Sequence, residues 1–500
     1  MTPDPASPSR HTTAPSRSHA TPPEPEPSPS VLRQFVAVVL PAILISAPLL
    51  IITQFTESPS LVSLSGWLQM ALIAYSAVRL TMLLVAGVPD LLFGVFWVFV
   101  YAALAVPALI QRASGRQPWR VEVGESDLVT AQFIVLVAVV AVDVTYNLVM
   151  RRRIAMPALT RRSTIGPQRL VIVALVYLPV LAVLIQRRGG IGTLFVTRAQ
   201  TLQSAGIESG VDYGLITAGV RVVPTVILGV ALLALRTQRP RESGALFVAI
   251  LYLPIVLIVT NPISTNRYSF ISATIFLILC AWNLRRPLRQ WLIVGTVAGA
   301  LILFPYLDYF RYRRSGAGAT GILALTTGDY DALFTTTMAV RWVAENGITW
   351  GYQALGVVGF WVPRGLWANK PADTGVTVAE GLGMSFTNLS SPLWAEGYVN
   401  FGLLGAIVAA SLFGLVAARL AVSHLTPGDA RGDLIWSFIV GYQLILLRGS
   451  LLQATGQVVV VVLMVLLLTR RTPAAEMAED ETAIDEPVPD RTSRASPRIL

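Results

Sequence analysis

Cysteine, lysine and histidine are almost missing from this chain of 500 residues. Cys280 is the only cysteine and lies inside an apolar run, which excludes a disulfide framework and a cysteine metal site. Two of the three histidines, His11 and His19, lie in the N-terminal tail, and His424 lies in a short polar loop. The chemistry of the protein must therefore be sought among other side chains.

Charge is also scarce, because only 13% of the residues are charged whereas soluble domains carry about a quarter. This deficit extends over most of the length and favours lipid as the main solvent. The net charge of +10 comes almost wholly from arginine, since Lys370 is the only lysine. The arginines lie between apolar runs and form no single basic face, so we expect membrane edges or anionic ligands and no nucleic acid partner.

Apolar runs of the length needed to cross a bilayer, roughly 20 residues, recur along the chain. The predicted spans are 33–54, 63–86, 91–110, 128–150, 170–186, 213–235, 244–260, 268–284, 291–308, 398–419, 433–448 and 453–469. The sequence thus predicts an all-α polytopic membrane protein with about twelve transmembrane helices in one domain, 33–470.

The arginine clusters orient these spans. Four clusters fall on one side: Arg151, Arg152, Arg153, Arg161 and Arg162; Arg236, Arg239 and Arg241; Arg285, Arg286 and Arg289; and Arg470 and Arg471. Arginine-rich loops face the cytoplasm, so we expect a plasma (inner) membrane protein with both termini cytoplasmic. The tails, 1–32 and 471–500, have compositions typical of disorder. Further arginines on the opposite face need another explanation.

The long outer loop, 309–397, is rich in tryptophan and other apolar residues, which predicts an ordered cap. Asp329 to Asn346 reads as an amphipathic helix with Phe334, Met338 and Trp342 on one stripe. The stretch from Tyr352 to Val362 is too short to span, so we expect it to lie in the membrane interface or to enter and return.

Two ionisable groups are predicted at membrane depth. Arg221 lies inside the 213–235 span with no acid in that span, which makes it a candidate functional residue. Asp143 shares a helical face with Asn147 and Arg151 and is interpreted as structural. Arg79 is expected to reach toward the inner headgroups.

The outer edge carries several further candidates. Arg267, Arg311, Arg364 and Arg448 each follow or end an outer hairpin or loop. Converging guanidinium groups suit a pyrophosphate, because their planar fork matches phosphate oxygens and keeps its charge. Glu396 lies at the mouth of the tenth span, where a half-buried position predicts a raised pKa and suits a general base; a structural salt bridge is the alternative. Asp329 and Asp331 are interpreted as helix caps.

The second half of the chain resembles the oligosaccharide repeat-unit polymerases of the O-antigen polymerase type. The matching pieces are NPISTNR (261–267), FPYLDYFR (304–311), GDYDALF (328–334), FWVPRGLWANKPADTG (360–375), NLSSPLWAEGYVNFGLLG (388–405) and LLRGS (446–450). The most specific of these is the aromatic-Pro-Arg-x-x-Trp-x-x-Lys-Pro piece. The first half agrees in hydropathy only.

The resemblance implies that the substrate is an oligosaccharide joined through pyrophosphate to a polyprenol. The growing chain would move from its carrier to a sugar hydroxyl of the next lipid-linked unit at the outer leaflet, with no cofactor or metal. Carried onto this chain, it implies Arg267, Arg311, Arg364 and Arg448 as pyrophosphate ligands, with Arg311 and Arg364 also catalytic and Glu396 as base. Lys370 lies in the same motif and is a further pyrophosphate candidate, and Arg221 is added from its burial alone. A flippase and a chain-length regulator are implied partners.

Two other classes remain open. A lipid-linked glycan ligase of similar layout generally relies on a histidine in the long outer loop, and this loop contains none. A flippase or transporter of lipid-linked glycans commonly shows an internal repeat. None is detected here, because the longest loop follows the ninth span and not the sixth.

Overall fold

The computed structural model describes residues 31–55, 63–119, 121–152, 163–196, 211–237, 243–262, 264–303, 321–387, 389–425 and 428–471. The bundle consists of α1 (Val31–Ile52), α2 (Leu64–Val85), α3 (Leu91–Val98), the π-helix η1 (Phe99–Ala105), α4 (Val106–Ser114), α5 (Glu125–Arg152), α6 (Pro167–Arg187), the 3₁₀ turn η3 (Ile191–Leu194), α8 (Val211–Thr237), α9 (Ser243–Val259), α10 (Arg267–Ala281), α11 (Arg286–Ala298), the π-helix η4 (Gly299–Leu303), α16 (Leu393–His424), α17 (Ala430–Arg448) and α18 (Leu451–Leu468). The predicted tails lie almost wholly outside the described residues.

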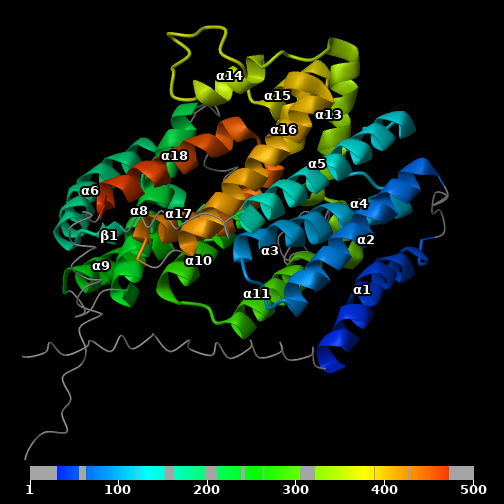
Figure 1. Ribbon diagram of the computed structural model, residues 1–500. Coiled ribbons are helices and arrows are strands. Elements are labelled where there is room, and N and C mark those ends of the chain that lie inside the picture. The colour runs from blue at the N-terminus through cyan, green and yellow to red at the C-terminus, as the bar shows by residue number, and fades with distance from the viewer. Residues whose placement is uncertain are drawn as a thin grey trace, which may run out of the picture.

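Between η4 and α16 the chain forms the remaining elements (Figure 1). They are the 3₁₀ turns η6 (Gly321–Thr326) and η7 (Gly328–Tyr330), followed by α13 (Ala332–Asn346), α14 (Tyr352–Val358) and α15 (Thr374–Gly381). We call the described part of the predicted outer loop, residues 321–387 and 389–397, the cap. In Figure 1, α13, α14 and α15 gather at one end of the bundle.

The protein is an all-α membrane protein. Eight helical stretches among the described residues are long and apolar enough to cross a membrane, with α3, η1 and α4 forming one continuous stretch. Outer helices also expose large apolar side chains: Ile172 and Val176 on α6 are 60% and 62% exposed, and Leu257 on α9 is 64% exposed. Such surfaces are stable against lipid tails and not against water.

The count of spanning helices differs from the prediction of about twelve. Two of the remaining predicted spans fall on the shorter helices α9 and α10, which have 17 and 15 residues, and a third falls on α1, which contains Pro41 and Pro48. The backbone sets the limits of α10, because this helix begins after its cap, Asn266, and ends where Trp282 becomes extended. Fifteen residues rise about 22 Å, short of a hydrocarbon core of about 30 Å. The fourth, 291–308, falls on α11 and η4, and its last five residues lie outside the described part.

The central element is the continuous stretch from α3 to α4, which is buried almost throughout. Trp97 is completely buried, and its ring packs edge-on against the ring of Tyr75 of α2, with 5.2 Å between the ring centroids. A helix that is apolar on every side is stable only where other helices surround it. The surrounding helices include α2, α16 and α17, and α16 also packs along α5.

Asp143 of α5 is structural, as expected, although its main partner was not foreseen. Arg79 of α2 donates to Asp143 Oδ1 at 2.5 Å, and Asn147 donates to the same atom at 2.7 Å. Arg79, which was expected to reach toward the inner headgroups, is thus held by this carboxylate. A buried carboxylate needs a partner more than the guanidinium needs water, so the pair forms between helices.

The end of the bundle opposite the cap is held by a small clip. Strands β1 (Ser163–Ile165) and β2 (Thr469–Arg471) pair antiparallel, joining the segment before α6 to the end of α18. His424 of α16 contacts Asp433 of α17 at 2.8 Å, and Arg236 of α8 contacts the same carboxylate at 3.4 Å. Polar contacts thus replace apolar packing where the helices leave the membrane.

Within the cap, the predicted helix forms as α13, but its burial is not confined to one stripe, because every residue from Ala332 to Val340 is buried. The helix ends at Asn346 and is followed by Gly347, and its stripe of Phe334, Met338 and Trp342 is buried. Apolar side chains of α14 and the following loop instead point outward, since Val358 and Trp361 are 75% and 67% exposed. The cap therefore has a packed inner side and an apolar outer side.

Helix α16 is broken near its start. Phe401 and Gly402 leave the helical conformation, and Gly402 adopts φ 64° and ψ −152°, a region open almost only to glycine. The break brings the backbones of Gly397 and Gly405 so close that a Cβ on either would overlap the other. The first eight residues of α16, with Glu396, thereby turn into the cap.

We predict that Gly402→Ala lowers the free energy of unfolding by about 1–3 kcal/mol, because alanine is strained in this conformation. The measurement is the thermal unfolding midpoint of the purified protein in detergent. Gly295→Ala on α11 is the matched control, since no atom lies within 4 Å of its Cβ position. Equal midpoints for the two variants would show that the break does not depend on glycine.

Candidate active site

Two of the predicted arginines meet at one short segment of the cap. Arg267 is the first residue of α10, and its Nη2 lies 2.9 Å from Asp329 Oδ2. Arg448 is the last residue of α17, and its Nη2 and Nε lie 3.0 and 3.1 Å from Asp331 Oδ1. Helices distant in sequence therefore bring two guanidinium groups to residues 328–331. The interpretation of Asp331 as a helix cap is wrong, because its side chain makes no capping hydrogen bond to α13.

Tyr268 joins these two ion pairs. The centroid of its ring lies 5.2 Å from Cζ of the Arg448 guanidinium, and its hydroxyl donates to the carbonyl of Asp329 at 2.6 Å. A cation over an aromatic face is stabilised by the ring quadrupole. We call Arg267, Tyr268, Asp329, Asp331 and Arg448 the arginine cluster.

Asp331 is the most deeply buried member of the arginine cluster, with 1% of its surface exposed. Burial raises the pKa of Asp331, while Arg448 and the hydroxyl of Ser390, which donates at 2.9 Å, oppose that shift. A buried charge is stable only with such partners. The two acids hold the guanidinium groups in fixed positions at the cap end of the bundle.

Glu396 is buried, with 2% exposed, whereas the sequence predicted half-burial. Its Oε2 accepts from Thr374 Oγ1 at 2.6 Å, and its Oε1 accepts from Ser450 Oγ at 2.8 Å and from Leu451 N at 3.1 Å. Leu451 is the first residue of α18, so the carboxylate also caps a helix N-terminus, where negative charge is favoured.

A second buried carboxylate, Asp373, stands next to Glu396 and was missed by the sequence analysis. Asp373 caps α15 by accepting from Gly375 N at 2.9 Å. Gly375 permits this arrangement, because a Cβ there would overlap the carbonyl of Leu389. The signal was present in the quoted piece KPADTG, where an Asp precedes a short apolar run. We call Asp373 and Glu396 the carboxylate pair.

Burial raises the pKa of Asp373, with hydrogen bonding by Ser450 and Gly375 opposing the shift. Its Oδ2 atom is buried and makes no hydrogen bond within the described part of the chain. A carboxyl group of this kind holds a proton more readily than a solvated aspartate. Asp373 is therefore the member of the carboxylate pair that keeps its proton to a higher pH than an aspartate in water.

One turn links the arginine cluster to the carboxylate pair. The turn between α17 and α18 supplies Arg448 to the cluster, while Ser450 and Leu451 bind Glu396. Ser390 lies in the segment just before α16, the helix that carries Glu396, and its hydroxyl donates to Asp331. The arginine cluster and the carboxylate pair are thus connected through this turn at the cap end.

Arg364 and Lys370 belong to a separate loop of the cap. Lys370 is buried, and its ammonium donates to the carbonyls of Phe360 and Val362 at 2.7 and 2.9 Å. Burial and the nearby Arg364 lower the pKa of Lys370. Arg364 is exposed and donates to the Lys370 carbonyl at 3.1 Å. Both cations hold the loop together in this structure, and neither contacts the arginine cluster through a described hydrogen bond.

The last two candidates take different positions. Arg221 of α8 donates to the carbonyl of Ser264 at 2.6 Å, three residues before Arg267, and so supports the turn that begins α10. Arg311 lies outside the described residues.

Among the described side chains, no group of three or more His, Cys, Asp or Glu is arranged to hold a metal ion. No family model, curated protein or solved structure matches the chain.

We predict that Asp373→Asn removes part of the pH dependence of stability. The folded state binds the proton of Asp373 more tightly than the unfolded chain, so the free energy of unfolding falls as pH rises above about 4. Asparagine keeps the helix cap and carries no charge. Melting temperatures from pH 4 to 8 should fall less in this variant than in the wild type. Glu380→Gln, an exposed change on the same helix, is the control. Parallel curves for Asp373→Asn and the wild type would contradict the assignment.

Proposed function

We propose that the protein is a membrane glycosyltransferase that polymerises polyprenyl-diphosphate-linked oligosaccharide repeat units. The observation that carries this proposal is that one turn supplies Arg448 to the arginine cluster and Ser450 and Leu451 to the buried Glu396. Transfer of a sugar from a diphosphate needs cations for the leaving group and a base for the acceptor. The arginine cluster and the carboxylate pair offer both.

The distribution of arginines between the two ends of the bundle supports an assignment of the membrane face on which the reaction occurs. Arginines at the end opposite the cap include Arg151, Arg152, Arg236, Arg285, Arg286, Arg470 and Arg471. Arginine-rich ends face the cytoplasm, so we infer that the cap faces outward from the plasma membrane and that both termini are cytoplasmic. The exposed apolar side chains of α14 and its loop suit the lipid interface on that outer side. A flippase would supply the lipid-linked units there, and a chain-length regulator is a further expected partner.

The proposed step is a displacement at the anomeric carbon of the growing chain. A hydroxyl oxygen of the incoming unit forms the new bond to that carbon, and the bond from carbon to the diphosphate oxygen breaks. The hydroxyl proton passes to Glu396, and the electron pair leaves with the polyprenyl diphosphate. Arg267 and Arg448, held in place by Asp329 and Asp331, bring positive charge to the diphosphate oxygens, which stabilises the leaving charge. Arg364 and Arg311 remain candidates to assist.

We predict that Arg448→Lys reduces polymerisation about 100-fold, the cost typical of losing one charge-stabilising donor. Lysine keeps the charge that Asp331 needs but not the guanidinium fork. The measurement is the set of lipid-linked intermediates in a strain lacking the gene and carrying each variant. Arg341→Ala, an exposed arginine of the cap paired only with Glu345 at 3.1 Å among described contacts, is the control.

The form of the accumulated lipid separates three functions. Loss of a polymerase leaves single repeat units exposed outside. Long chains that remain on the polyprenol would indicate a ligase, and single units retained at the inner leaflet would indicate a flippase. Either of these last two results overturns the proposal.

We also predict that Glu396→Gln lowers the polymerisation rate by at least about 100-fold, as expected for loss of a general base. The glutamine oxygen still accepts hydrogen bonds from Ser450 and Leu451, so the melting temperature should change little. Glu380→Gln is the matched control on the cap surface. A Glu396→Gln variant with wild-type activity would reduce Glu396 to a cap of α18.

A further inference from the structure

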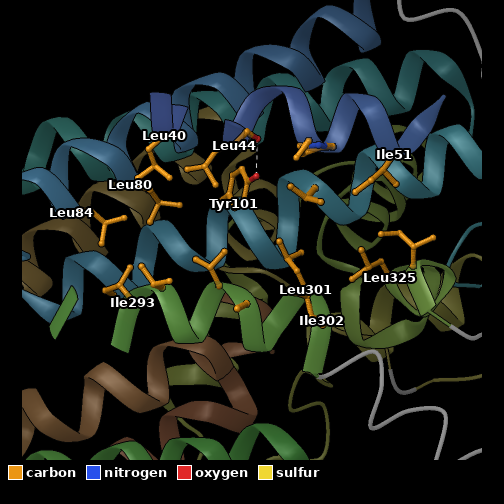
Figure 2. A pocket seen from close by; sticks show the side chains of 17 residues that line it. Leu40, Leu44, Ile51, Leu80, Leu84, Tyr101, Ile293, Leu301, Ile302 and Leu325 are labelled. Atoms are coloured by element: carbon orange, nitrogen blue, oxygen red, sulfur yellow. Dashed lines mark hydrogen bonds between the residues drawn. The ribbon is translucent and has the colours of Figure 1, made fainter. Parts of the chain in front are cut away.

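An apolar cavity of about 370 Å³ opens between α1 and α11, over α2 and η1 (Figure 2). In Figure 2, Leu40, Leu44 and Ile51 of α1 form one wall, and Ile293, Leu301 and Ile302 form the opposite wall. Its volume lies in the lower part of the range of small-molecule sites, about 300–1,000 Å³. The described structure therefore contains a second candidate site, apart from the arginine cluster and the carboxylate pair.

The lining of this cavity excludes polar ligands. All 17 lining side chains are aliphatic except Tyr101. The Tyr101 hydroxyl donates to the carbonyl of Leu44 at 2.7 Å, so its proton is already used. A polar group placed in the cavity would lose its hydrogen bonds to water without replacement. The occupant must be hydrocarbon.

The cavity is elongated along the helices. Its α1 wall runs from Leu40 to Ile51, a helical rise of about 16 Å. This length is roughly half of a bilayer hydrocarbon core of about 30 Å. A groove of this shape suits a long chain that lies parallel to the helices.

One end of the groove meets the cap. Leu325 of η6 lines the groove, and its carbonyl accepts from Gln111 at 3.0 Å. Gln111 also donates to the carbonyl of Tyr330 at 2.8 Å, and the Tyr330 hydroxyl donates to Ala300 of η4. The segment that ends the groove is thereby fixed to the segment that carries Asp329. A chain in the groove would direct its head toward the arginine cluster.

We propose that this groove binds the isoprenoid chain of a polyprenyl diphosphate, with the diphosphate at Arg267 and Arg448. The choice of diphosphate as the head rests on the proposed function. The groove supplies binding energy from the apolar tail, and the arginine cluster fixes the end at which bonds change. An ordinary phospholipid acyl chain is the competing occupant.

The test is photolabelling of the full-length protein in phosphatidylcholine nanodiscs. The probe is a polyprenyl diphosphate that carries no sugar and has a benzophenone on its chain, and a second probe is phosphatidylcholine with a benzophenone on one acyl chain. Mass spectrometry of labelled peptides locates the adducts. We expect the polyprenyl probe to label α1 and α11. Ala47→Phe, which fills the groove, should reduce that labelling at least about tenfold.

Ala42→Phe is the matched control, since Ala42 lies on the same helix, is exposed and does not line the groove. Ala298→Trp fills the groove from the opposite wall and replaces Ala47→Phe if that variant does not fold. Equal labelling of the groove by both probes, or labelling by the polyprenyl probe elsewhere, overturns the proposal. Because the probe lacks sugar, a labelled groove stands even if Arg448→Lys polymerises normally, a result that would defeat only the proposed function.

Discussion

The ion pair between Arg448 and Asp331 determines how the cap is placed on the bundle. Asp331 is almost fully buried, and a buried carboxylate without a cation costs several kcal/mol, about 3–5. Arg448 satisfies it from the end of α17, and the next residues, Ser450 and Leu451, bind Glu396. One turn therefore fixes both acids relative to each other. The positions of α13 and of the first turn of α16 follow from it.

The turn between α17 and α18 stabilises two charged side chains, Arg448 and Glu396, that would each be poorly stabilised alone. Arg448 would gain little from an exposed acid, because solvent screens such pairs, and Glu396 would be costly to bury without donors. Burying both beside the N-terminus of α18 supplies three hydrogen bonds to Glu396 and an aromatic face, Tyr268, to Arg448. Fixed donors of this kind need no reorganisation when charge develops on a substrate, which is the condition for electrostatic catalysis.

Much of the bundle could be predicted because lipid imposes a simple pattern on sequence. Spans such as 128–150 and 170–186 coincide with α5 and α6, and the helix predicted in residues 329–346 forms as α13. The number of crossings could not be predicted in this way, because hydropathy does not detect where Asn266 begins α10 or where Gly402 breaks α16. The composition of a segment indicates whether lipid or water surrounds it. Capping residues and glycines determine where its helix begins, ends or breaks.

The site was only partly predictable for a related reason. Arg267 and Arg448 were identified by their place at the outer edge, which their own spans reveal. Their partners, Asp329 and Asp331, were interpreted as helix caps, because a sequence shows neighbours along the chain and not contacts 62 or 117 residues away. Lys370 and Arg364 illustrate the converse, since a cation in a promising motif can serve its own loop through backbone carbonyls. Asp373 was overlooked because its importance comes from Glu396, which follows 23 positions later in the chain. Long-range pairing of charge, more than helix formation, is thus the information that this fold adds to its sequence.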